Sequence, residues 1–265
     1  MQFERSLYGL NRRGVGIIQI LPLLKRDLYG FRRHFLAYLT LWILTPILIH
    51  LLLAIPLSRL ISFEVQYLNW AAAGIWGTSA SMASFLETSM RIRKINYETD
   101  QIDAILQSPI SNLEFLMALS LRGFIFGFIQ FIFSILITCT LNHEYLGIFN
   151  ILMIIIQVMS LILFFSVLGA MIGLLISNRI IFIQISLALF IIISLGMGAF
   201  IPISSYPESY IAIVNKIPLM VILQNMQSII IHQNIQWISF FLTLIITTLL
   251  FIITLITSNK VFRNI

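Results

Sequence analysis

The chain has 265 residues, of which 59% are hydrophobic and only 10% are charged. Its mean hydropathy of +1.00 indicates a protein whose solvent is largely lipid. The formal net charge is +6, but the basic residues gather in the segments between long apolar runs. This arrangement is typical of membrane topology and attraction to anionic lipid, and it gives no support to nucleic-acid binding.

Three runs without any charged residue are the clearest signal. They cover residues 145–178, 180–207 and 217–259, with lengths of 34, 28 and 43 residues. About 20 residues of helix cross the hydrocarbon of a bilayer, so each run is long enough to span it. We therefore predict an all-α polytopic membrane protein with six transmembrane helices, at 35–57, 65–86, 123–141, 145–176, 180–201 and 236–258.

The basic residues predict the orientation of these spans. With six spans both termini lie on one side, and 14 of the 16 Lys and Arg residues fall on that side. Only Arg59 and Lys216 fall on the other. Because basic residues near spans stay in the cytoplasm, we predict cytoplasmic termini and a cytoplasmic second loop, in a cytoplasmic (inner) membrane.

What the sequence lacks restricts its function. No Asp, Glu, Lys or Arg lies in the middle of a predicted span, which disfavours an ion-coupled carrier. No GxxxxGK[ST] phosphate loop is present, and we predict no catalytic, cofactor-binding or metal-binding residues in this chain. The hydrophilic segments are too short to fold alone, so residues 1–265 form one transmembrane domain.

Residues 1–34 form a basic cytoplasmic segment before the first span. Its end is amphipathic, with Leu24 and Phe31 on an apolar face. Such a helix lies in the headgroup layer and contacts membrane lipid. A simple anchor and a docking element for a partner both fit this pattern. The predicted interface helix includes Lys25, Arg26, Phe31, Arg32 and Arg33.

The second loop, 87–122, carries the most distinctive pattern. Ile102, Ile105 and Leu106 share one face of a short helix, and Pro109 ends it. Ser111 and Glu114 then form an S-x-x-E capping box that starts the next helix. The apolar face fits a partner's groove, and it fits equally a hairpin that dips into lipid.

The outer loop before the last span, 202–235, is apolar and broken by prolines. Non-helical backbone at membrane depth needs protein or water around it, so a hairpin that re-enters from outside and covers a central pathway is one prediction. Two helices lying flat at the interface is the other. The predicted outer gate comprises Pro202, Tyr206, Pro207 and Pro218.

The sequence resembles the type-2 ABC exporter permeases in the order of these features. In that family a basic amphipathic helix leads into the first span, and a coupling helix followed by LL-x-x-P-[IV]-S-x-x-E follows the second. Two short re-entrant helices precede the last span. The chain matches the central pattern at Ile105, Leu106, Pro109, Ile110, Ser111 and Glu114.

The resemblance implies a permease subunit that pairs with a second copy or a paralogue and with separate ABC ATPase subunits, which bind ATP and Mg²⁺. We expect outward movement of a lipid, a lipid-linked glycan or an amphipathic drug-like substrate. An intramembrane lipid-modifying enzyme is the alternative from another class, and a non-transporting membrane scaffold is the third. An ATPase chain that co-purifies with the protein separates the first from the others.

Overall fold

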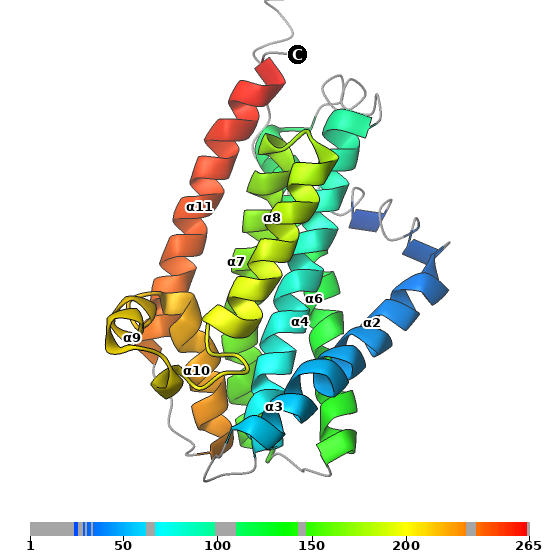
Figure 1. The fold of residues 1–265 in the computed structure, drawn as a ribbon. Coiled ribbons are helices and arrows are strands. Elements are labelled where there is room, and N and C mark those ends of the chain that lie inside the picture. Colours follow the sequence, from blue (N-terminus) through cyan, green and yellow to red (C-terminus); the bar gives the residue numbers. More distant parts are fainter. Residues whose placement is uncertain are drawn as a thin grey trace, which may run out of the picture.

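The computed structural model is a bundle of long helices (Figure 1). It describes residues 24, 25, 29, 31, 32, 34–61, 67–98, 110–142, 147–231 and 237–263, and the side chains among them up to residue 261. All regular elements in these ranges are helical, which agrees with the predicted fold class. Six residues of the predicted sites lie outside the described ranges: Arg26, Arg33, Ile102, Ile105, Leu106 and Pro109.

The first half of the bundle consists of α2 (Phe35–Ile49), the π-helical turn η2 (His50–Ala54), α3 (Ile55–Leu60), α4 (Tyr67–Arg93), the π-helical turn η3 (Lys94–Glu98) and α6 (Asn112–Asn142). The second half consists of α7 (Ile148–Leu175), α8 (Arg179–Ile191), the π-helical turn η4 (Ile192–Gly196), the short 3-10 helix η5 (Ile203–Ser205), α9 (Glu208–Val214), α10 (Pro218–Ile231) and α11 (Trp237–Arg263).

Within the described residues, five helices are long and apolar enough to cross a membrane, or six if the bent pair α9 and α10 counts as one span. The five are Phe35–Leu60, α6, α7, Arg179–Gly196 and Trp237–Val261. Each coincides with a predicted span. The remaining predicted span, 65–86, falls on α4, whose composition is more polar.

Helix α4 is the centre of the bundle. It has 27 residues, so it is about 40 Å long and exceeds the thickness of the hydrocarbon layer. It lies alongside α6 and α8 in Figure 1, and most of its side chains are buried. Its polarity is therefore not exposed to lipid, because the other helices surround it, and we count α4 as a crossing.

Small residues allow the helices around α4 to approach closely. A Cβ atom at Gly169 of α7 would lie 2.5 Å from the carbonyl oxygen of Phe85, and one at Gly173 would lie 2.6 Å from that of Ser89. Both acceptors belong to the α4 backbone. Glycines one turn apart thus bring α7 into backbone contact with α4, as small-xxx-small spacing does in membrane helices.

Hydroxyl groups hold the same helices together. Ser79 of α4 shares a hydrogen bond of 2.7 Å with Ser134 of α6, and Thr88 shares one of 3.0 Å with Ser166 of α7. Trp76 donates its indole N–H to Thr138 at 2.6 Å. Buried hydroxyls that find such partners connect helices without leaving a polar atom in hydrocarbon.

Pro46 in the last turn of α2 produces a further contact between helices. A proline has no N–H, so the carbonyl oxygen of Trp42, four residues earlier, loses its helical donor. The side chain of Gln130 on α6 donates to that oxygen at 3.2 Å. The break in α2 thus becomes an attachment to α6.

Three predicted boundaries differ from the structure. The fifth span was predicted to reach residue 201, but it ends at Gly196, and Gly198 then takes a φ of 76° that L side chains rarely adopt. The loop predicted at 87–122 is shorter, because α4 and η3 continue to Glu98 and α6 begins at Asn112. Averaging hydropathy over a window does not detect where backbone hydrogen bonding continues past the apolar run.

We predict that Gly169→Ala lowers the melting temperature of the protein in detergent. The added methyl group would displace α7 from the α4 backbone, and overpacking of this kind costs about 1–3 kcal/mol. Gly147→Ala is the matched control, because a Cβ there meets nothing within 4 Å. Thermal unfolding followed by circular dichroism measures both variants. Equal melting temperatures would contradict the close α4–α7 contact.

Candidate functional sites

Helices α4 and α11 end, and α6 and α8 begin, at one end of the bundle, which is at the top in Figure 1. We call it the basic end because Arg91, Arg93, Lys94 and Arg179 lie there. The described chain enters and leaves residues 99–109 at this end. We call residues 99–109 the coupling segment; they lie outside the described ranges, whereas both of their flanks are described.

The N-terminal flank of the coupling segment is attached to the neighbouring helices. Arg93 donates to the carbonyl oxygen of Ser177 at 3.0 Å, and its guanidinium lies over the ring of Phe182 at 5.5 Å. Tyr97 donates to the carbonyl oxygen of Leu174 at 2.6 Å. Burial raises the pKa of Tyr97 above its ordinary value, so its hydroxyl stays protonated as a donor at neutral pH.

The C-terminal flank carries the predicted capping box. The backbone N–H of Ser111 donates to the Glu114 carboxylate at 2.8 Å, and the backbone N–H of Glu114 donates to the Ser111 hydroxyl at 3.2 Å. The Ser111 hydroxyl also donates to Glu114, at 2.8 Å. This reciprocal arrangement satisfies N–H groups that the first turn of α6 leaves without helical partners, and it confirms the local prediction.

A small apolar core lies between these flanks. It joins η3 and the end of α4 to the first turns of α6 and to the end of α7. The two flanks of the coupling segment therefore belong to one packed unit rather than to separate loops. The core contains Ile92, Ile95, Phe115, Leu116, Leu119, Ala170 and Leu174.

An ion pair connects α4 and α6 farther from the basic end. The Arg122 Nε donates to Oε1 of Glu87 at 2.8 Å, and the Nη2 of Arg122 contacts the same oxygen. Tyr38 of α2 donates to Oε2 of Glu87 at 3.2 Å. The side chains of Arg122 and Glu87 are only 9% and 14% exposed. Three helices thus meet at one shielded carboxylate.

The sequence analysis missed this ion pair. Glu87 follows the predicted end of the second span by one residue, and Arg122 precedes the predicted third span by one residue. Both were therefore counted as loop residues. Their positions at matching ends of successive antiparallel spans, with opposite charges, were the available signal, because such side chains lie at similar depth.

The N-terminal segment packs beside α2 and α6. Leu24 is buried next to Ala118 of α6, whereas Lys25 and Arg32 are exposed. Phe31 is half-buried, with its ring centroid 5.6 Å from that of Trp42 and 5.5 Å from that of Phe126. These aromatic contacts fasten the segment to the bundle.

At the opposite end, the chain between α8 and α9 is non-helical, and side chains satisfy its carbonyl oxygens. Tyr67 of α4 donates to Phe200 at 2.5 Å. Gln227 of α10 donates to Gly198 at 2.9 Å and to Ala199 at 3.3 Å. Non-helical backbone in a membrane protein needs such internal donors.

Two tyrosines complete this arrangement of donors. Tyr206 donates to the carbonyl oxygen of Leu195 at 2.7 Å, and Tyr210 donates to that of Gly196 at 2.7 Å. Their rings are stacked, with centroids 4.8 Å apart. The last turn of η4, whose carbonyls have no further helical donors, is therefore held by the segment that follows it.

The prolines of the predicted outer gate occupy the ends of short elements. Pro202 is buried and precedes η5, Pro207 precedes α9, and Pro218 is the first residue of α10. Helices α9 and α10 meet at 98°. Because α8 ends and α11 begins at the same end of the bundle (Figure 1), this bent pair returns the chain to the side from which it came.

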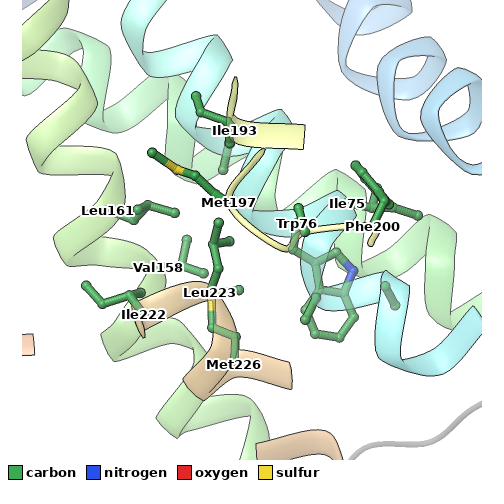
Figure 2. Packing of buried hydrophobic residues seen from close by; sticks show 14 of the residues in the cluster. Ile75, Trp76, Val158, Leu161, Ile193, Met197, Phe200, Ile222, Leu223 and Met226 are labelled. Carbon is green, nitrogen blue, oxygen red and sulfur yellow. The ribbon is translucent and has the colours of Figure 1, made fainter. Parts of the chain in front are cut away.

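Helix α10 is packed into the bundle rather than lying on its surface. Figure 2 shows Ile222, Leu223 and Met226 of α10 facing Val158 and Leu161 of α7. All five side chains are fully buried. This packing favours a hairpin inserted among the spans over the alternative of two helices lying flat at the interface.

The described residues contain no group of three or more His, Cys, Asp or Glu side chains that could hold a metal ion. The polar side chains described above, such as Arg93, Tyr97, Tyr206 and Gln227, make structural contacts between elements of the bundle. The arrangement is suited to transmitting movement between helices, and it offers no constellation for acid-base or nucleophilic chemistry among the described side chains.

The model of the ABC-2 type transporter family matches residues 18–231. The chain therefore belongs to the ABC-2 type transporters, and it is a membrane-spanning permease component of an ABC transporter. The match includes the second half of the N-terminal segment, the coupling segment and the bent pair α9 and α10. Comparisons with curated proteins and with solved structures gave no significant match.

We predict that Glu87→Gln destabilises the protein by about 3–5 kcal/mol, because it removes the negative charge that faces the shielded Arg122 guanidinium. The double variant Glu87→Leu/Arg122→Met should recover most of this loss, since a buried pair replaced by apolar side chains is often neutral. Lys260→Gln, an exposed charge on α11, is the control and should change little.

Chemical or thermal unfolding in detergent compares these three variants with the unmodified protein. If Glu87→Gln and Lys260→Gln have the same unfolding midpoint, the ion pair contributes nothing to the stability of the junction of α2, α4 and α6. If the double variant is less stable than Glu87→Gln, the two side chains act independently of each other.

Proposed function

We propose that the chain is the permease subunit of an ATP-driven exporter, and that the coupling segment receives the movement of a partner ATPase. The observation that carries this proposal is the attachment of both flanks of residues 99–109 to the same packed unit. Tyr97 and Arg93 hold one flank to the α7–α8 connection, and the Ser111–Glu114 box holds the other at the start of α6.

This arrangement favours rigid-body transmission. A force on the coupling segment acts on α4 and α6 together, because the small core joins their ends and the Glu87–Arg122 pair joins them deeper in the bundle. Helix α7 follows, since its glycines contact the α4 backbone. ATP with Mg²⁺ would bind in the separate ATPase subunits, and closure of those subunits would displace the spans.

The substrate class follows from the surfaces available to line a pathway between two permease copies. The exposed face of α8 is apolar, with Ile183 and Leu187 among its exposed side chains. A path lined in this way suits a lipid, a lipid-linked glycan or an amphipathic drug-like molecule better than an ion. A second copy or a paralogue would supply the other wall.

The orientation proposed for the transporter places the basic end in the cytoplasm, with both termini on that side of a cytoplasmic (inner) membrane. Arg91, Arg93, Lys94 and Arg179 at that end support it, because basic residues next to spans remain cytoplasmic. The bent pair α9 and α10 then lies on the outer side, where Tyr206 and the three prolines would form part of a gate.

We predict that Ile105→Asp abolishes binding of the ATPase subunit while leaving expression and membrane insertion normal. A charge placed in an apolar contact costs several kcal/mol if that face is fully buried by the partner. The measurement is co-purification of the ATPase in mild detergent, followed by its substrate-stimulated hydrolysis rate.

Gln101→Asp is the matched control, because it adds the same charge on the opposite face of the predicted helix. It should bind the ATPase like the unmodified chain. Equal loss in both variants would indicate a general effect of negative charge, and equal retention would show that the helix is not a docking element.

The orientation is tested by labelling with a membrane-impermeant thiol reagent in intact cells. Cys139, the single cysteine, is first replaced by Ala. Ser209→Cys, at an exposed position on α9, should then react from outside, and Gln101→Cys should react only after permeabilisation. Labelling of Gln101→Cys in intact cells would show that the orientation is the opposite of the one proposed. It would also overturn the proposed direction of transport.

A further inference from the structure

The N-terminal segment and the first turn of α2 enclose an open groove of about 360 Å³. Its lining combines two cations with three aromatic rings, from Lys25, Tyr29, Phe31, Arg32 and Phe35. This volume lies within the range of small-molecule sites. The function proposed above does not use the groove.

Charge defines what the groove attracts. Lys25 and Arg32 are both exposed, and the described residues that line the groove include no carboxylate. Both cations line the same groove, so one ligand can reach both. Two cations at one mouth suit a phosphate group with a net negative charge.

The aromatic wall of the groove, formed by Phe31 and Phe35, is fixed by packing before a ligand arrives. Phe31 contacts Phe35, Tyr38, Trp42 and Phe126, with ring centroids 5.1–5.6 Å apart. Leu24 anchors the segment next to Ala118 of α6. A preformed site loses less free energy to ordering when a ligand binds.

An apolar track continues from the groove along α2. Phe35 both lines the groove and begins this helix, and exposed leucines follow on α2 and its continuation η2, among them Leu36, Leu44 and Leu51 at 74%, 54% and 50% exposure. Their spacing of eight and seven residues keeps them on one face of the helix. An anionic head beside a long apolar track is the shape of a phospholipid, whereas an acidic peptide would need no such track.

We propose that this groove is a binding site for the headgroup of an anionic phospholipid, whose acyl chains lie along α2. Lys25 and Arg32 hold the phosphate, and the rings of Phe31 and Phe35 contact the glycerol region. The occupied site touches Trp42 through Phe31, and it touches the Glu87–Arg122 pair through Tyr38. Lipid binding therefore stabilises the junction of α2, α4 and α6.

The experiment uses the full chain in nanodiscs that contain phosphatidylcholine alone or mixed with phosphatidylglycerol. After extraction into detergent, native mass spectrometry counts the lipids that remain bound. We expect the unmodified protein to retain phosphatidylglycerol with about a thirtyfold preference, since each basic side chain near a lipid surface contributes about a fivefold preference. Lys25→Gln/Arg32→Gln should lose this preference.

Arg179→Gln/Lys260→Gln is the matched control, since it removes two exposed cations that do not line the groove, and it should retain the lipid. Equal retention by both double variants overturns the proposal. Displacement of phosphatidylglycerol by inorganic phosphate, at constant ionic strength, also overturns it, because the site would then recognise free phosphate. If Lys25→Gln/Arg32→Gln retains the lipid but no longer binds the ATPase or a second copy, the groove belongs to a protein partner. That result also overturns the lipid site.

Discussion

In the hydrocarbon of a bilayer no water is available, so each backbone N–H and C=O group needs a hydrogen-bond partner from the protein. This constraint explains the contacts at each helix break. Pro46 removes the donor for the Trp42 carbonyl, and Gln130 of α6 replaces it. After η4 the chain leaves the helix, and donors from α4, α9 and α10 reach its carbonyls, the closest being Tyr67 at 2.5 Å. Breaks that would weaken a helix in isolation thus fix α2 to α6 and the bent hairpin to the bundle.

The same constraint accounts for the composition of α4. This helix is surrounded by others, so it benefits from small side chains that allow close approach, between which Trp76 and Phe85 are fully buried. The hydroxyls of Ser79 and Thr88 are satisfied by the α4 backbone and by side chains of α6 and α7. A helix that fails a hydropathy criterion can therefore be the centre of a membrane domain.

The sequence predicted what depends on local pattern. Long uncharged runs identified the apolar spans, and the spacing of Ser111 and Glu114 identified a capping box that forms as expected. The Glu87–Arg122 pair was missed because its members are 35 residues apart and meet only when two helices pack. The end of the fifth span was misplaced because Gly198 turns a chain that remains apolar. Hydrogen bonds such as that of Gln227 cannot be predicted from local sequence patterns, because their acceptors lie in distant parts of the chain.

The distribution of these contacts supports the proposal that part of the permease moves as one body. Helices α4, α6 and α7 share hydroxyl pairs, glycine contacts and the core at the basic end, so they behave as one unit. Helices α8 and α11 are the least buried of the candidate spans. Packed interfaces are bistable rather than continuously deformable, so under the proposed coupling a force on the α4–α6 connection would displace the unit as a whole. Helix α10 would move with this unit because Ile222, Leu223 and Met226 are buried against α7, and the exposed apolar face of α8 then remains as a surface for a second subunit.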